Sequence, residues 1–81
     1  MLTEAEKIIL KSTNKRWRYI VRGSIGGLHL FEAKPHKIYG DWIEMERDIE
    51  TFYAFTDIFQ SVKWSDNEPL QFRDEKGEFL L

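Results

Sequence analysis

Three glycines crowd the stretch RGSIGGLHL, at positions 23, 26 and 27, and a glycine-rich loop is one way for a protein to bind phosphate. Such a loop lies between a strand and a helix, so that backbone N–H groups and the helix N-terminus converge on the anion. Here the glycines lead into LHLFEA, which is strand-like, and no Gly-Lys-Ser/Thr sequence follows. We interpret them as the bend of a β-hairpin, where Gly26 or Gly27 supplies a positive φ angle.

The remaining reactive side chains show no pattern typical of catalysis or metal binding. His29 is expected in mid-strand and His36 in a proline-containing turn, so nothing holds the two together as metal ligands. No serine has a base at a recognisable spacing, and chance pairs are easily found among fourteen acids. The absence of cysteine excludes a disulfide, a thiolate metal site and a cysteine nucleophile. We predict a protein that is not an enzyme and that has no cofactor or metal.

Charge is unevenly distributed and suggests two candidate interaction surfaces. Residues 1–40 carry eight Lys/Arg and three Asp/Glu, whereas residues 41–81 carry four and eleven. The basic surface consists of Lys15, Arg16, Arg18 and Arg22, and the acidic surface of Glu44, Glu46, Asp48 and Glu50. Arginines beside an aromatic residue on a strand are suited to phosphates and bases, and an acidic face to a basic groove on another protein. Solvated charge is the alternative for both surfaces, and the pI of about 5.6 is low for a nucleic-acid-binding domain.

The elements that must position these surfaces begin with a helix and a hairpin. LTEAEKIILKS predicts a short helix, because Thr3 and Glu6 form the pattern of a capping box. KRWRYIVRG and LHLFEA predict two strands on either side of the glycines. In the first strand Trp17, Tyr19 and Val21 are expected to face inward and the arginines outward, because side chains alternate along a strand.

The rest of the chain is less regular. Residues 41–55 fit either a helix or two short strands joined by a charged loop. After them, TDIFQSV predicts one helical turn with Thr56 as its cap, and VKW and LQFR predict short strands. DEKGEFL predicts a closing hairpin with Gly77 at its bend.

A chain of 81 residues is expected to form one domain, residues 1–81, and its twelve aromatic residues supply enough apolar surface for a core. No stretch resembles a signal peptide, and no apolar run has the length of a membrane span. A chain without disulfides is at home in the cytoplasm. We therefore expect a cytoplasmic protein without membrane association.

Two stretches, WRYIVRGSIGGLHLFEAKP and DIFQSVKWSDNEPLQF, carry a resemblance. They contain an aromatic strand, a glycine turn, a strand leading to Lys34-Pro35, and later Asp57 to Phe59, Val62, Trp64 and Glu68-Pro69. This order resembles a family of small uncharacterised proteins of phages and prophages from Gram-positive bacteria and Bacteroides. The resemblance implies an accessory protein inside a bacterial host. It also favours strands over a helix in residues 41–55.

We therefore predict an α+β fold: a mainly antiparallel β-sheet, open or curled into a small partly open barrel, with one short N-terminal helix. The expected core is Trp17, Tyr19, Val21, Leu28, Leu30, Trp42, Phe52, Phe59, Val62 and Trp64. The predicted function is non-enzymatic binding of a protein partner, or of a second copy of the chain. The alternative is nucleic-acid binding through the arginine face of the first strand.

Overall fold

The computed structural model describes residues 1–43, 49–51, 55 and 57–81. The chain begins with helix α1, Glu4–Lys11. Its start is the predicted capping box, because Glu6 N–H donates to Thr3 Oγ1 over 3.1 Å and Thr3 N–H donates to Glu6 Oε1 over 2.9 Å. The two bonds satisfy backbone donors that a helix N-terminus otherwise leaves unpaired.

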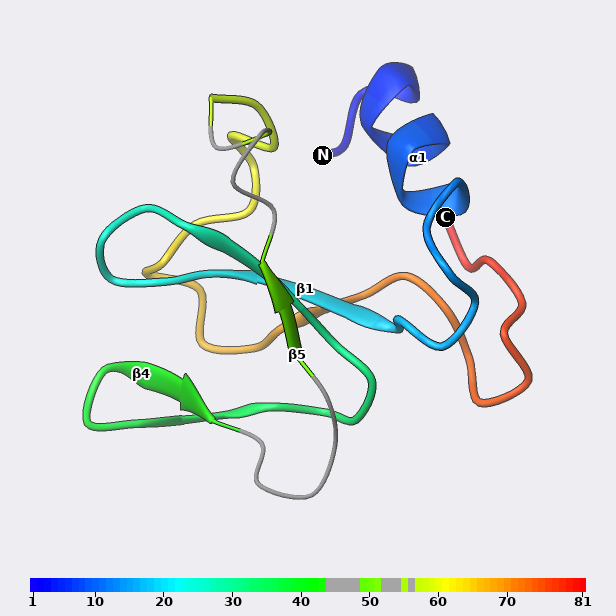
Figure 1. Cartoon of the computed structure of the whole chain (residues 1–81). Coiled ribbons are helices and arrows are strands. Elements are labelled where there is room, and N and C mark those ends of the chain that lie inside the picture. Colours follow the sequence, from blue (N-terminus) through cyan, green and yellow to red (C-terminus); the bar gives the residue numbers. More distant parts are fainter. Residues whose placement is uncertain (44–48, 52–54, 56) are drawn as a thin grey trace.

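Within the described residues, the strands form two antiparallel sheets (Figure 1). The larger sheet has the order β5-β2-β1-β6, and the smaller one is the hairpin β3-β4. The bounds are Tyr19–Arg22 for β1, Leu28–Phe31 for β2, His36–Ile38 for β3, Asp41–Ile43 for β4, Ile49–Thr51 for β5 and Leu70–Gln71 for β6. The larger sheet is open, with β5 and β6 at its edges, so the strands do not close a barrel. The α+β prediction is confirmed.

The glycine stretch is the bend of the β1–β2 hairpin, as predicted. Gly23 N–H donates to the Gly27 carbonyl over 2.7 Å, and Gly26 N–H donates to the Gly23 carbonyl over 3.0 Å. Gly26 has a φ of +93°, a conformation that costs glycine little and other residues more. The strands that leave this bend pair Ile20 with Leu30.

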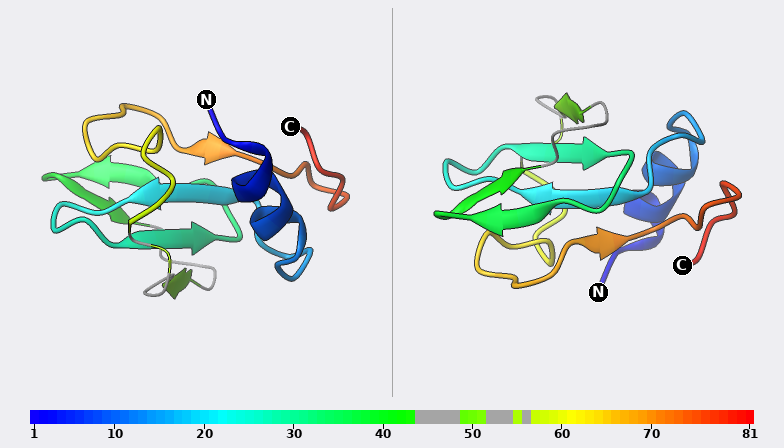
Figure 2. Two further views of the ribbon diagram at one scale, coloured as in Figure 1. Left: turned by 90° about the horizontal axis from the view of Figure 1, so that it is seen from above. Right: turned by 90° about the horizontal axis from the view of Figure 1, so that it is seen from below.

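Different elements pack on the two faces of the large sheet. In Figure 2, α1 and the segment 57–63 lie on one face, and the β3-β4 hairpin lies on the other. The main core lies under the helix and the segment, and its buried residues are Leu2, Leu10, Trp17, Ile20, Leu28, Leu30, Phe59, Val62 and Phe72. Val21 and Phe31 are buried too, but they alternate with Ile20 and Leu30 along their strands and so face the hairpin side.

Several predicted core residues are placed differently. Trp64 is 42 % exposed, and Tyr19 and Trp42 are only half-buried, while Phe52 lies outside the described residues. Ile20 takes the inward position expected of Tyr19. The reason is that β1 begins only at Tyr19: Trp17 lies in a turn, with its N–H bonded to the Asn14 carbonyl, so Trp17 and Ile20 reach the same core.

The C-terminal half is also only partly as expected. The closing hairpin is confirmed, because Gly77 has a φ of +86° and Asp74 N–H donates to the Glu78 carbonyl over 3.0 Å. β6 covers only part of LQFR, and VKW forms no strand. The described part of TDIFQSV consists of turns and bends instead of one helical turn, and Phe59 within it has a φ of +60°. Thr56, the proposed cap, lies outside the described residues.

Candidate functional site

The predicted arginine face does not exist as one outward surface. Arg22 points to the helix side of the sheet, and its guanidinium donates to the carbonyls of Val62 over 2.8 Å, of Ile58 over 2.8 Å and of Phe59 over 3.0 Å. It also donates to the Gly26 carbonyl over 2.8 Å. Arg22 follows Ile20 by two positions and therefore shares its face, which faces the core. The side chain ties the segment 57–63 to the sheet.

The other predicted basic residues lie in the segment just before β1. Arg16 forms an ion pair with Glu32 at 2.8 Å, and Arg18 donates to the carbonyls of Glu32 and Glu75 over 3.4 and 3.0 Å. Lys15 is exposed, with its stem against Gly77. Arg16 and Arg18 thus meet at Glu32, and Arg18 and Lys15 both reach the closing hairpin.

Three of the predicted acidic residues, Glu44, Glu46 and Asp48, lie outside the described residues. Glu50 lies in β5 and pairs with Leu30 in the register of the sheet. The acidic surface therefore stays a prediction.

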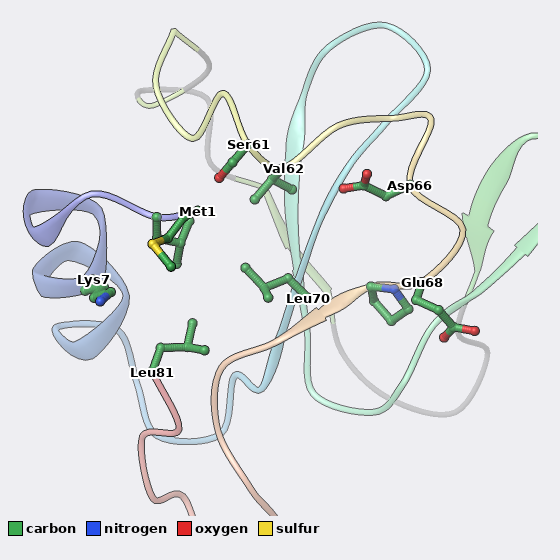
Figure 3. Close-up of a pocket in the computed structure, with 10 residues that line it drawn as sticks. Met1, Lys7, Ser61, Val62, Asp66, Glu68, Leu70 and Leu81 are labelled. Atoms are coloured by element: carbon green, nitrogen blue, oxygen red, sulfur yellow. The ribbon is translucent and has the colours of Figure 1, made fainter.

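The larger of the two hollows described here lies beside α1 (Figure 3). Its volume is about 460 Å³, and most of its lining residues are apolar. They come from both ends of the chain, from α1 and from the segment 61–70: Met1, Leu2, Lys7, Ser61, Val62, Asp66, Glu68, Pro69, Leu70 and Leu81. We call this hollow the apolar pocket. An apolar pocket with a few polar groups at its rim is the usual form of a binding site.

The wall of the apolar pocket is fixed by a contact that sequence reasoning missed. Glu6 is only 7 % exposed, and its Oε2 accepts a hydrogen bond of 2.6 Å from Phe59 N–H. Val62 N–H in turn donates to the Phe59 carbonyl over 2.9 Å, which places Val62 in the wall. The segment 57–63 is thus attached to α1 by Glu6 and to the sheet by Arg22, so the pocket is largely preformed.

The rim of the apolar pocket carries charge of opposite sign on its two sides (Figure 3). Asp66 and Glu68 lie on one side, and Lys7 lies on the helix side. Asp66 Oδ2 accepts a hydrogen bond of 3.0 Å from Lys63 N–H, which holds the carboxylate in place. Glu68 and Lys7 are ion-paired with Lys34 at 3.1 Å and Glu4 at 3.4 Å.

A second exposed feature is the tip of the β3-β4 hairpin, which was not predicted. Tyr39 and Gly40 both have positive φ values, 51° and 83°, as in the two-residue turns of tight hairpins, and the Tyr39 side chain is fully exposed. Trp64 Nε1 donates to the Gly40 carbonyl over 2.9 Å. Lys37 holds its ammonium 5.0 Å from the Trp42 ring centre and 4.8 Å from that of Trp64. The hairpin is therefore attached to the segment that forms the rim of the apolar pocket.

Among the described residues, no group of possible metal ligands lies at either feature. Within the described part of the chain, no three His, Asp or Glu side chains are grouped as metal ligands. His29 is half-buried on the hairpin side of the sheet, and desolvation lowers its pKa below the ordinary value of 6.5. None of the helices in the described ranges is long and apolar enough to span a bilayer.

Comparisons with protein-family models, curated proteins and solved structures found no match.

Proposed function

We propose that the protein is a non-enzymatic binding protein that recognises a segment of a partner protein in the apolar pocket. The observation that carries the proposal is the apolar hollow of about 460 Å³ with two carboxylates on one side of its rim. A hollow of this kind accepts an apolar anchor side chain, and buried anchors supply most of the energy of protein interfaces.

Charge at the rim selects the kind of segment. Asp66 and Glu68 favour a Lys or Arg next to the apolar anchor, because complementary charge steers and orients a partner. Glu68 exchanges its present ion pair with Lys34 for the partner's cation at little cost, since an exposed ion pair contributes only about 0–1 kcal/mol. The partner segment therefore has an aliphatic residue with a basic residue next to it, on the side of Asp66 and Glu68.

The resemblance to phage and prophage proteins supports a cellular location and a role. We place the protein in the cytoplasm of a bacterial host as an accessory factor. Nucleic-acid binding by the arginines of the first strand is the weaker alternative, because Arg18 and Arg22 use their guanidinium groups to bond backbone carbonyls.

An NMR titration of the ¹⁵N-labelled protein with two short peptides tests the proposal. Both peptides carry two adjacent leucines, flanked by lysines in one and by glutamates in the other. We expect the lysine peptide to shift the amide signals of residues 61–68, Leu70 and Leu81. The glutamate peptide should bind at least about tenfold more weakly, which corresponds to a difference of about 1.4 kcal/mol in binding free energy. Equal shifts with both peptides, or none near the pocket, would refute the proposal.

Matched variants locate the effect. Asp66→Asn keeps an oxygen for the Lys63 N–H, and Glu68→Gln removes only an exposed charge, so both are expected to fold normally. Each variant should weaken binding of the lysine peptide. Binding of the glutamate peptide should be unchanged or slightly tighter. Ser61→Phe fills the hollow and should remove binding of the lysine peptide altogether.

A further inference from the structure

Arg73 is a buried cation that has no carboxylate partner among the described residues. Its side chain is 2 % exposed, and its guanidinium donates six hydrogen bonds of 2.9–3.1 Å, every one to an uncharged oxygen. The acceptors lie at the C-terminal end of α1 and just beyond it: the carbonyls of Leu10, Lys11, Thr13, Asn14 and Trp17, and Thr13 Oγ1. Among the residues the structure describes, no carboxylate forms an ion pair with Arg73.

Such a charge is unusual, because buried ions are normally paired with an ion of opposite sign. The guanidinium stays protonated, although desolvation lowers the pKa of Arg73 below its ordinary value. Hydrogen bonds satisfy its Nη1 and Nη2 donors. The partial negative charge of the helix C-terminus compensates only part of its full positive charge.

A hollow of about 300 Å³ lies against this cation, and we call it the basic pocket. It is lined by Lys11, Lys15, Arg73, Lys76, Gly77, Glu78 and Phe79. All three lysines are exposed, and in the described part of the chain none has a carboxylate within 4.0 Å. The Lys11 ammonium lies 5.1 Å from the centre of the Phe79 ring.

Arg73 offsets the negative partial charge with which the C-terminal end of α1 would otherwise repel an anion. The C-terminus of a helix carries partial negative charge on its free carbonyls, which repels anions. Arg73 binds the carbonyls of Leu10 and Lys11 and places a full positive charge beneath them. Glu78 is the one lining carboxylate, and it weakens the field of the three lysines without cancelling it.

We propose that the basic pocket binds a phosphate group, which supplies the counter-charge that Arg73 lacks. Three exposed lysines line this hollow, and ammonium groups are suited to the several acceptor oxygens of a phosphate. The same chemistry is offered by a small phosphorylated molecule and by the backbone of a single-stranded nucleic acid. This inference does not rest on the proposed function, because the two pockets share no lining residue.

Calorimetric titration at low ionic strength tests the inference, with pyrophosphate, adenosine 5′-monophosphate and a ten-nucleotide oligo-dT as probes. We expect at least one probe to bind. Lys15→Gln and Lys76→Gln should each lower its affinity about tenfold, which corresponds to the loss of one hydrogen bond between charged groups. Glu78→Gln should strengthen binding. Lys63→Gln, an exposed lysine outside the basic pocket, is the matched control and should change little.

The arms of the experiment distinguish the source of the phosphate. Binding of pyrophosphate or the mononucleotide in preference to oligo-dT identifies a small phosphorylated ligand. Tighter binding of oligo-dT, with a steep loss on adding salt, identifies a nucleic-acid backbone. No binding by any probe at low salt, or binding that survives in the Lys15→Gln/Lys76→Gln double variant, overturns the inference.

Discussion

Glu6 in α1 accepts a 2.6 Å hydrogen bond from the backbone N–H of Phe59, a residue with a φ of +60°. The same carboxylate caps the helix through Thr3 N–H. One buried acid therefore stabilises the helix N-terminus and fixes the segment that forms a wall of the apolar pocket.

Replacing Glu6 tests this double role. We expect Glu6→Ala to lower the free energy of unfolding by about 2–4 kcal/mol, because it removes a charged hydrogen bond and one half of the capping box. Glu6→Gln keeps one oxygen acceptor and should cost about half as much. Urea denaturation measures both. A loss below about 0.5 kcal/mol for Glu6→Ala, the range of ordinary surface substitutions, would show that the contact does not hold the segment.

Arg22 is predicted to stabilise the fold instead of binding a ligand. Lysine cannot reproduce the fork that reaches the carbonyls of Val62, Ile58 and Phe59, so Arg22→Lys should cost about 1–3 kcal/mol. Arg16→Lys keeps the charge of an exposed ion pair and should cost less than about 0.5 kcal/mol. Thermal unfolding of the two variants compares a half-buried guanidinium with an exposed one. Equal costs would contradict the structural role of Arg22.

Tyr39 occupies a backbone conformation that other residues tolerate better. Its φ of +51° suits Asn or Gly, which dominate this position of tight hairpin turns. Its ring is fully exposed and gains no stability from burial. Tyr39→Asn should therefore raise the free energy of unfolding by about 0.5–1 kcal/mol, and Tyr39→Ala should not. A destabilised Asn variant in urea denaturation would mean that the tyrosine ring contributes to the hairpin.

Protonation of His29 is expected to destabilise the protein. Because burial lowers its pKa below 6.5, the unfolded chain binds a proton in a pH range where the folded chain does not. The contribution of the neutral side chain is complete above pH 6.5 and declines as the pH falls below that value. Unfolding measured between pH 5 and 7.5 should show this decline, and His29→Gln should reduce it. His36→Gln, at an exposed histidine, is the control. If the free energy of unfolding depends on pH in His29→Gln as it does in the unmodified protein, the decline comes from other groups.

Local signals in the sequence predicted the beginning of the fold well. Thr3 with Glu6, and the glycines around position 26, each act through bonds within a few residues, so their effect is readable from spacing alone. The face of β1 was predicted less well. The turn at Trp17 delays the strand to Tyr19, and this shift turns Arg22 toward the core.

The two pockets depend on contacts between distant parts of the chain, which no spacing rule reveals. Arg73 reaches the end of α1 from more than fifty residues away, and Glu6 reaches Phe59 across a similar separation. Lys15 was predicted as part of a basic surface, but Lys11 and Lys76 were missed because the closing hairpin brings them beside it. An excess of basic residues in the first forty positions was the only indication.

Intermolecular NOEs between the protein and the leucine–lysine peptide test the proposed function most directly. The proposal predicts contacts from the peptide leucine methyl groups to the methyl groups of Val62, Leu70 and Leu81, which line the apolar pocket. Contacts confined to the exposed side chains of Ile38, Tyr39 and Trp64 would contradict it and move the binding site to the β3-β4 hairpin.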